Sequence, residues 1–436
     1  MPYDIILGRD ASDKEKFGDK GLIYLGKGYV KMGQYTSLSN KIWLDVARSH
    51  VILVAGKRGS GKSYSLGVIA EELANLPQET SQNIASLVFD TMGIFWTMKY
   101  KNEKDVELLQ KWDLKSKTLP LKVFVPFGKS QDYDEKGIPY DKTFALKAGE
   151  LDAEDWITLF NLDLTSLPGV LTERIISKLK LQSKNFTIKN IQEEIDKDKS
   201  ASQEIKQIVS GLFEAADTWG IFSQGEEGTE MSELVTAGTT TVLDTSVYSS
   251  IGAFNIRALV ISLVSRKLFE SRMSSRKKEE LLALQHGQDY LAYNTQRQEP
   301  LIWIFIDEAH EFLPKEGKTP ASDALIQLLR EGRQPGISLV MATQQPGQIH
   351  KDVMTQSDIV ISHRVTAKPD VEALNNIMQT YLLENIQQQL DNLPSTKGSA
   401  IVLDDNSERI YPISVRPRFT WHGGEAPSAV KANLKI

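Results

Sequence analysis

The segment from Gly56 to Ser63 has the residue types and spacing of a phosphate-binding loop. It reads Gly-Lys-Arg-Gly-Ser-Gly-Lys-Ser and fits the pattern Gly-x-x-x-x-Gly-Lys-Ser/Thr at every required position. In such a loop the backbone N–H groups surround the phosphates, a lysine reaches the β- and γ-phosphates, and a hydroxyl binds Mg²⁺. The nucleotide-binding residues expected here are Gly56, Gly59, Ser60, Gly61, Lys62, Ser63 and Tyr64, with Ser63 also at the metal.

Two adjacent carboxylates, Asp307 and Glu308, follow an uncharged apolar run at residues 302–306. Taken alone, such a pair is more often a solvated turn or a helix cap. Beside a phosphate loop, however, Asp307 would hold Mg²⁺, and Glu308 would orient and deprotonate the attacking water. This pair therefore predicts the second half of an ATP-hydrolysing site. We expect His310 and Glu311 to cap or solvate the next helix rather than to bind a metal.

A third polar group follows another apolar run, at residues 338–342. Gln344 lies at the tip of this expected strand and could hydrogen-bond the γ-phosphate or the attacking water. Arg330 and Arg333 end the helix expected before the strand. A cation at that position stabilises the helix dipole, or else it reaches the nucleotide of a neighbouring subunit and stabilises transition-state charge. The residues alone leave both interpretations of the arginines open.

These groups need a scaffold that brings distant segments together, and the chain has the pattern of one. From residue 51 onward, wholly apolar runs alternate with amphipathic segments, which indicates a buried parallel sheet in an α/β domain. The expected strands are Val51–Ala55, Ser86–Asp90, Lys122–Val125, Thr240–Asp244, Ile302–Ile306, Ser338–Ala342 and Asp358–Ile361. Ligands bind at the carboxyl ends of strands in open sheets of this class, which is where the polar residues fall.

The rest of the chain suggests further parts. Alternating runs separated by Gly, Ser and Asp predict a small antiparallel sheet or β-barrel at residues 1–46. Helical patterns predict an α-helical insertion, and its charge run fits a solvated helix face better than a nucleic-acid surface. Residues 272–298 are expected to form an exposed connection. The expected parts are the barrel at 1–46, an ATPase core at 47–149 and 236–418, the insertion at 150–235, and a tail at 419–436.

Composition narrows the function classes. The chain has 436 residues, 41% of them hydrophobic and 25% charged, as in soluble globular proteins. The absence of a long apolar run and of a leader-like start predicts a cytoplasmic protein with no membrane partner. Cysteine is absent, which excludes disulfides, thiolate zinc sites and cysteine nucleophiles. The net charge of −6 means that any DNA contact must be a local basic surface.

Taken together, the motifs resemble the HerA family of the HerA/FtsK superfamily of ring ATPases. The resemblance covers roughly residues 45–418, interrupted by the helical insertion. Its most specific part is the run from Glu331 to Gly336 that leads to Gln344, since many ATPases share a phosphate loop. The other segments that carry it are Ser49–Ser63, Asp90–Gly93, Ile306–His310, Ala342–Pro346, Ser357–Arg364, Lys397–Val402 and Pro412–Pro417.

The resemblance implies a RecA-like P-loop core with a small N-terminal β-barrel. It also implies a homo-hexamer that moves double-stranded DNA through a central pore on ATP hydrolysis. A partner nuclease or another effector would act with it, in DNA repair by end processing or in antiviral defence. The nucleotide-site residues that carry over are Lys62, Ser63, Asp307, Glu308 and Gln344, with Arg333 as the expected arginine finger and Arg48 as a second candidate.

The sequence also departs from the family. Lys57 and Arg58 stand where the family usually has Thr, and the acidic, aromatic motif after the second strand is reduced to Asp90–Phe95. Two other functions therefore stay open: a secretion or conjugation motor, and a nucleotide-gated scaffold that activates an effector without moving anything. The weak candidates for pore-lining residues are Arg257, His350 and Lys351, each of which is more often an ordinary surface residue.

Overall fold

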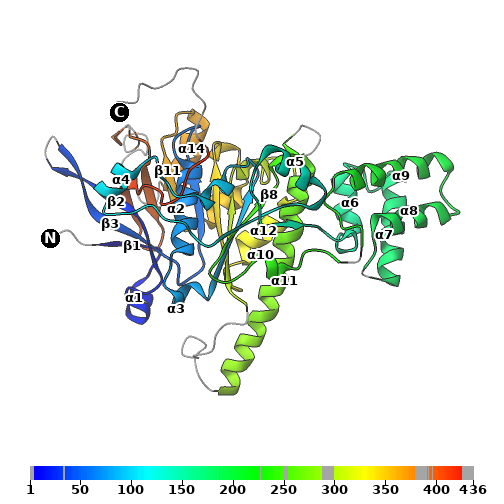
Figure 1. Cartoon of the computed structure of the whole chain (residues 1–436), viewed down its shortest axis with the longest axis horizontal. Helices are drawn as coiled ribbons and strands as arrows, with labels where there is room; N and C mark the ends of the chain where they lie inside the picture. Colours follow the sequence, from blue (N-terminus) through cyan, green and yellow to red (C-terminus); the bar gives the residue numbers. More distant parts are fainter. Residues whose placement is uncertain are drawn as a thin grey trace.

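The computed structural model describes residues 4–32, 35–183, 185–225, 227–249, 254–286, 299–378, 390, 392–394 and 396–424. Within them a single open sheet of 13 strands runs through the molecule in the order β1-β3-β2-β13-β12-β11-β4-β10-β9-β5-β8-β6-β7 (Figure 1). From β11 to β7 every neighbouring pair is parallel, whereas β12, β13, β2 and β3 pair antiparallel. The α/β class expected from the sequence is therefore confirmed.

The strands are β1 Ile5–Leu7, β2 Leu22–Met32, β3 Tyr35–Asp45, β4 Val51–Ala55, β5 Ile84–Asp90, β6 Leu121–Pro126, β7 Lys142–Phe144, β8 Thr240–Asp244, β9 Leu301–Ile306, β10 Ile337–Thr343, β11 Ile359–His363, β12 Ser399–Asp404 and β13 Arg409–Val415. The longer helices are α2 Lys62–Ala74, α7 Leu167–Gln182, α8 Ile188–Lys197, α9 Gln203–Thr218, α11 Phe254–His286, α12 Ser322–Glu331 and α14 Lys368–Met378. The shorter ones are α1 Ala11–Phe17, α3 Gln78–Ser81, α4 Val106–Lys111, α5 Ser130–Lys136, α6 Ala153–Leu159, α10 Met231–Leu234 and α13 Lys351–Gln356. All seven strands expected from the apolar runs are present, with ends that differ by two residues at most.

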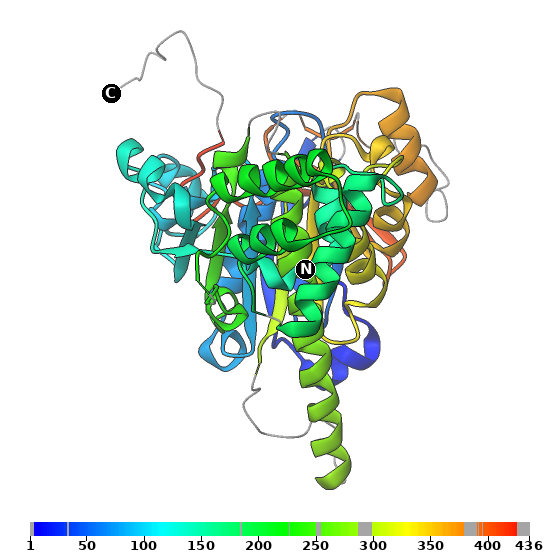
Figure 2. The ribbon, with the colours of Figure 1, turned by 90° about the vertical axis from the view of Figure 1, so that its right-hand side faces the viewer.

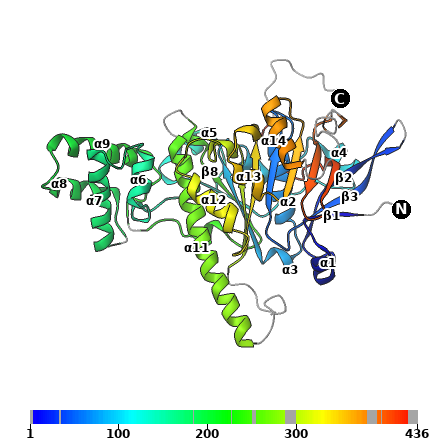
Figure 3. The ribbon, with the colours of Figure 1, turned by 180° about the vertical axis from the view of Figure 1, so that it is seen from behind.

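The central strands are apolar throughout because both faces of the sheet are covered. In β4, Ile52 and Val54 pack toward α2, while Val51 and Leu53 pack toward the face covered by α11 and α12. Figure 3 shows α11, α12 and α13 lying across that second face. A strand buried on both faces has apolar residues at every position instead of alternating apolar and polar ones. Such a strand therefore stands out in the sequence as a continuous apolar run.

The N-terminal strands do not form the expected barrel. In the described part of the chain, β1, β2 and β3 extend the central sheet, because β2 pairs with β13 through Gly28 and Ile413. An alternating pattern predicts antiparallel pairing but does not say whether the sheet closes on itself. The end of the sheet opposite to β7 is therefore an open ribbon (Figure 1).

Helices dominate residues 153–218, as expected. The helices α6, α7, α8 and α9 pack on one another and project from the end of the molecule opposite to β1 and β3. Figure 2 looks directly onto this helical segment. Trp156 lies at its centre, in ring contact with Phe160, Phe213 and Phe222. The division of the chain into domains stays a prediction.

The expectation of an exposed connection at residues 272–298 is wrong for its first half. Helix α11 continues to His286, and residues 287–298 lie outside the described residues. Arg276 pairs with Glu280 one turn later at 2.9 Å, an arrangement that supports a helix even where its charges face solvent. The Lys, Arg, Glu and Gln residues of this stretch are good helix formers, so its polar composition did not exclude a helix.

A segment after β13, residues 416–424, crosses the outer side of α2. Glu71 of α2 is fully buried and accepts hydrogen bonds from Arg416 at 3.2 Å and Arg418 at 3.0 Å, and from the backbone N–H groups of Phe419 and Thr420 at 2.9 and 3.0 Å. The pKa of Glu71 stays lowered despite its burial because of the two arginines and these donors. One carboxylate thus joins the helix to the crossing segment.

We expect Glu71→Ala to lower the free energy of unfolding by about 3–5 kcal/mol, because it removes the carboxylate partner of buried Arg418 and one of the two carboxylates, Glu71 and Glu72, that pair with buried Arg416. Chemical denaturation measures this change. A matched control is Glu79→Ala, whose ion pair with Lys20 is exposed and should contribute little. Equal midpoints for the Glu71 variant and the wild-type protein would contradict the assignment.

Candidate nucleotide site

The phosphate loop leaves β4 between the ends of two neighbouring strands. The backbone N–H of Gly56 donates to Thr343 O of β10 at 3.3 Å, and that of Lys57 donates to Arg364 O after β11 at 3.0 Å. Gly61 has φ of 115°, a conformation open to glycine and strained for other residues, and helix α2 begins directly after it. The loop is thus a turn from strand to helix with its backbone N–H groups at the helix start.

A buried histidine, His363, forms the floor of the loop. A Cβ atom on Gly56 would lie 2.7 Å from the His363 Cβ, so this position requires glycine. The ring donates from Nδ1 to Ser399 O at 3.0 Å and accepts at Nε2 from Ser65 Oγ at 2.9 Å. Burial lowers the pKa of His363 to about 4, which keeps the ring neutral as this bonding requires. Sequence analysis missed His363, although a polar residue at the end of an apolar run was a usable signal.

Lys62 is the first residue of α2 and is buried. Its Nζ donates to Lys57 O at 3.2 Å, and it forms no ion pair with any described residue. Burial lowers the pKa of Lys62, while the charges of Glu308 and Asp307 oppose that shift. A buried ammonium group without a bonded anion fits the role of phosphate ligand expected for it.

Ser63 and Asp307 meet at the carboxyl edge of the sheet. Ser63 Oγ donates to Asp307 Oδ2 at 2.5 Å, across 244 positions of the chain. Asp307 is buried, which raises its pKa, and the hydrogen bond from Ser63 opposes the rise. These two oxygens are hard donors of the kind that Mg²⁺ prefers, and a cation would stabilise the buried carboxylate.

Glu308 is held in an unusual conformation beside them. Its backbone is left-handed, with φ of 51° and ψ of 44°, and its N–H donates to Asp307 Oδ1 at 2.9 Å. Gln344 Nε2 donates to Glu308 Oε1. Glu308 Oε2 is buried without a hydrogen-bond partner among the described residues, and His310 Nδ1 lies 3.6 Å from it. A strained backbone and an unpaired carboxylate oxygen are features of a working site.

His310 differs from its expected role. Residues 309–311 form a single short turn, and His310 Nδ1 lies 3.2 Å from Thr343 Oγ1 at the tip of β10. The residue therefore faces the site rather than capping a helix. Within the described residues, no group of three or more His, Asp or Glu side chains is arranged to hold a metal, so a metal role for His310 gains no support.

The two candidate finger arginines lie at the other edge of the sheet. Arg333 precedes β10 and Arg48 precedes β4, whereas the phosphate loop follows β4. Arg333 Nη2 donates to Gln356 O at 2.5 Å and lies 3.5 Å from Asp358. Arg48 pairs with Asp13 at 2.7 Å. With about 3.3 Å per strand residue, some 20 Å separates either arginine from the phosphate loop of its own chain.

Two other expected residues face elsewhere. The side chain of Tyr64 turns toward the crossing segment, where its hydroxyl accepts from the N–H of Arg418 at 2.7 Å. Any contact of Tyr64 with a nucleotide would therefore come from its backbone at the helix start. Arg257 is buried and lies 3.5 Å from Glu311. Arg257 was a weak candidate for the pore and more often an ordinary surface residue, and its burial, where α11 packs on the sheet, argues against both roles.

A second carboxylate pair lies further along the same edge. Asp90 and Asp244 end the neighbouring strands β5 and β8 and stand opposite each other in register, both buried. Burial raises the pKa of Asp90 to about 7, the charge of Asp244 adds to this rise, and N–H donors from Gly93 to Phe95 oppose it. Burial also raises the pKa of Asp244. The pair therefore retains a proton near neutral pH.

Comparison with known families gives two matches. The family described as "Helicase HerA, central domain" matches residues 30–262, more than half of the chain. The family described as "Zonular occludens toxin (Zot)" matches residues 255–371. Among the described residues, no helix is long and apolar enough to cross a bilayer.

Individual relatives agree with the first match. "DNA double-strand break repair helicase HerA" of Pyrococcus furiosus is 26% identical over 149 residues, which are 32% of this chain and 24% of that protein. "Probable DNA double-strand break repair helicase HerA" of Methanocaldococcus jannaschii is 33% identical over 102 residues, or 23% and 20%. The chain thus spans between a fifth and a quarter of the length of these curated relatives.

Solved structures show a similar fold. VirB4 of Thermoanaerobacter pseudethanolicus has a TM-score of 0.56 at 12% identity, covering 92% of this chain and 97% of that one. The bacterial conjugative coupling protein TrwBdeltaN70 has a TM-score of 0.50 at 13% identity, covering 86% and 87%. At this identity the likeness concerns the arrangement of the elements alone.

The carboxylate pair predicts how stability depends on pH. Because the pKa of Asp90 is raised from 3.8 to about 7, its contribution to stability is complete below about pH 4 and is lost as the pH rises through about 7. Asp244→Asn removes the neighbouring charge and should reduce the fall in melting temperature between about pH 5 and pH 8. As a control, Asp323→Asn alters an exposed pair with Lys318 and should keep the wild-type dependence. An unchanged dependence in Asp244→Asn would refute this account.

Proposed function

The chain belongs to the family of HerA helicase central domains, and from this premise we propose that it is an ATP hydrolase that works as a motor on DNA. The observation that carries the proposal is the convergence of three distant segments on one edge. Ser63 contacts Asp307, and Gln344 contacts Glu308, directly beside the phosphate loop. A metal ligand, a base and a γ-phosphate contact are thus available together.

ATP with Mg²⁺ is the proposed cofactor. Ser63 and Asp307 would hold the metal, and Lys62 would contact the β- and γ-phosphates. Bound Mg²⁺ neutralises charge on the phosphate oxygens. The buried ammonium of Lys62 supports this fit because the phosphates would supply its counter-charge. The Ser63 and Asp307 oxygens, 2.5 Å apart, support it because Mg²⁺ would supply the counter-charge of the carboxylate. Gly56, Gly59, Ser60, Gly61 and Tyr64 would contribute backbone N–H groups.

Glu308 is the proposed general base. Gln344 fixes one of its carboxylate oxygens, and the other, Oε2, has no hydrogen-bond partner among the described residues. An oxygen in that state can accept a proton from a water placed for attack on the γ-phosphate. In the same arrangement Gln344 would exchange its hydrogen bond when the phosphate leaves, so it would report hydrolysis.

Arg333 is the proposed arginine finger, and it must act on a neighbouring subunit. Its position about 20 Å from its own phosphate loop supports this, because no side chain spans that gap. Arg48, at the same edge, is the second candidate. We therefore propose a closed ring of identical subunits, a homo-hexamer by analogy with the family, in which each subunit completes the site of the next.

The proposed substrate is double-stranded DNA in the central pore of that ring, and the proposed setting is the cytoplasm. The net charge of −6 suits a ring with an acidic exterior and basic pore loops. His350 and Lys351, just beyond the carboxyl end of β10, are the remaining pore candidates. The matched relatives are named DNA double-strand break repair helicases, which supports a role in DNA repair. For that role we propose DNA end processing with a partner nuclease. Another effector, in antiviral defence, is the alternative partner.

ATPase activity with and without DNA tests the proposal. We expect double-stranded DNA to raise the hydrolysis rate several-fold, and Glu308→Gln to abolish turnover while ATP still binds, because the metal ligands remain. Lys62→Ala, which removes the phosphate contact, serves as the control that loses binding. Stimulation by a protein substrate alone would favour a secretion or conjugation motor. Stimulation only by a co-purified effector would favour the scaffold.

Mixing two inactive variants tests the finger. Arg333→Ala keeps its own catalytic residues, and Lys62→Ala keeps its arginine, so mixed rings should hydrolyse ATP where a Lys62→Ala subunit supplies the finger to an Arg333→Ala subunit. Each variant alone should lose about 10³-fold or more in kcat. Hydrolysis at intermediate ratios is the expected result, and no recovery at any ratio would contradict action between subunits.

A further inference from the structure

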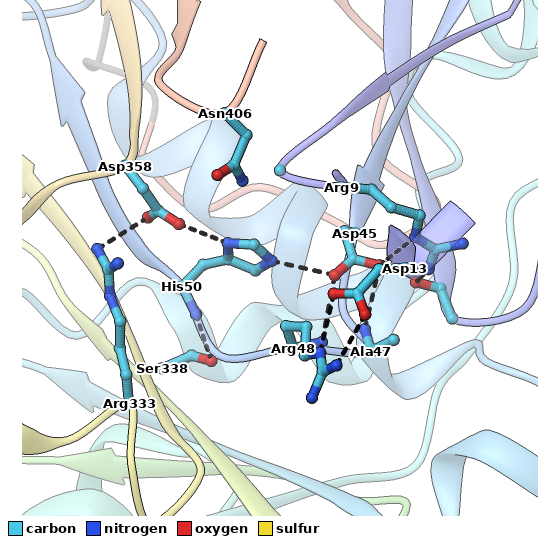
Figure 4. Close-up of polar contacts among 12 residues, drawn as sticks. Arg9, Asp13, Asp45, Ala47, Arg48, His50, Arg333, Ser338, Asp358 and Asn406 are labelled. Atoms are coloured by element: carbon cyan, nitrogen blue, oxygen red, sulfur yellow. Dashed lines mark hydrogen bonds and ion pairs between the residues drawn. The ribbon is translucent and has the colours of Figure 1, made fainter. Parts of the chain in front are cut away.

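A buried chain of charged side chains joins Arg333 to the N-terminal strands (Figure 4). Its centre is Asp358, just before β11. Asp358 Oδ1 lies 3.5 Å from Arg333 Nη2 and accepts from the N–H of Val51 at 2.8 Å, while Oδ2 contacts His50 Nδ1 at 2.7 Å. One carboxylate therefore contacts the arginine, the histidine and the first residue of β4.

His50 continues the chain on its other side. Its Nε2 lies 3.2 Å from Asp45 Oδ2 at the end of β3, and Asp45 is paired in turn with Arg9. Both ring nitrogens thus face carboxylates, an arrangement that requires the doubly protonated ring. Burial alone would lower the pKa of His50, but Asp358 and Asp45 raise it to about 9. The ring is therefore a cation between two anions.

The same residues join the strands that form the nucleotide site. The backbone N–H of His50 donates to Ser338 Oγ of β10 at 3.1 Å. The N–H of Val51, the first residue of β4, donates to Asp358, which directly precedes β11. The amino ends of β4, β10 and β11 are thus held together by polar contacts. Their carboxyl ends surround the phosphate loop at the opposite edge.

Arg333 is fixed on one side and open on the other. Within the described part of the chain, Arg333 makes its polar contacts with Nη2, which donates to Gln356 O and lies near Asp358. Its side chain is nevertheless 43% exposed, whereas those of His50 and Asp358 are 3% and 9% exposed. The guanidinium therefore presents a free edge outward from a buried charged support.

We propose that His50 and Asp358 are positioning residues that hold Arg333 ready for the nucleotide of a second copy of this chain; this inference rests on the proposed role of Arg333 between subunits. A long side chain loses rotamer freedom when it must reach a partner, and a side chain already held loses less. A displacement of about 1 Å at a reacting centre can cost about 100-fold in rate. By holding Arg333, His50 and Asp358 would reduce both the loss of rotamer freedom and the loss of rate through displacement.

The test places a substitution in one or the other partner of the mixed ring described above. His50→Phe keeps a ring but removes both donors. Introduced into the Lys62→Ala protein, which supplies the finger, it should lower the restored hydrolysis by about tenfold to 100-fold. Introduced into the Arg333→Ala protein, which supplies the catalytic site, it should leave the restored rate within about twofold. A general folding defect would act in both placements.

Each outcome is decisive. A loss confined to the finger-supplying subunit supports the positioning role, and equal losses in both placements, or none in either, overturn it. If the unmodified mixture of Arg333→Ala and Lys62→Ala shows no hydrolysis at any ratio, the finger itself is refuted and the inference falls with it. The unmodified mixture therefore separates the two failures.

Two further variants guard against misfolding. Asp358→Asn keeps the shape of the carboxylate and an acceptor for the N–H of Val51 but removes the charge that Arg333 faces, so it should reproduce the asymmetric loss. Glu194→Gln is a matched control, since Glu194 is 8% exposed and paired with Lys178 far from the network. In either partner it should leave the restored rate unchanged. Thermal unfolding of every variant establishes that the subunits compared are folded.

Discussion

Parallel pairing of β4, β10 and β9 is the constraint on which the candidate site depends. Parallel neighbours end at the same edge, so the residues that follow them meet whatever their separation in the chain. This register brings Ser63 to Asp307 and Gln344 to Glu308. A slip of one residue would turn these side chains to the other face of the sheet. The apolar faces that fix the register therefore also fix the chemistry.

The two edges of the sheet carry different charge arrangements. At the carboxyl edge, burial raises the pKa of Asp307 and lowers the pKa of Lys62. Shifted pKa values of this kind are common where charged groups bind a ligand. At the amino edge, His50 and its carboxylates are already mutually satisfied. A rigid strand such as β4, with one end in each arrangement, places the candidate site and the proposed finger arginine at a fixed separation.

Most of the scaffold and half of the site could be predicted because they depend on local patterns. Fully apolar strands and the glycine spacing around Lys62 are visible in the sequence, and the strand ends indicate that Asp307 and Gln344 lie at the same edge of the sheet. A polar residue at the end of an apolar run marks His363 in the sequence, but its contact with Ser65, 298 positions away, is not visible there. The network around His50 could not be predicted, since His50 meets Asp358 across 308 positions. The prediction of an N-terminal barrel was wrong for a similar reason. Strand β2 pairs with β13, which lies far from it in the sequence, and the local pattern does not show this pairing. Helix α11 was missed because its exposed end has a polar composition.

The segment that crosses α2 has a consequence for biosynthesis. Glu71 leaves the ribosome early, while Arg416, Arg418 and Thr420 follow it by 345 to 349 positions. Until they arrive, the helix that begins with Lys62 carries a carboxylate in an apolar surface with no counter-charge, and it cannot pack in its final form. Because N-terminal parts of a chain can otherwise fold during translation, this late partner delays the nucleotide site. Helix α2 can therefore reach its final packing only after synthesis has passed residue 420.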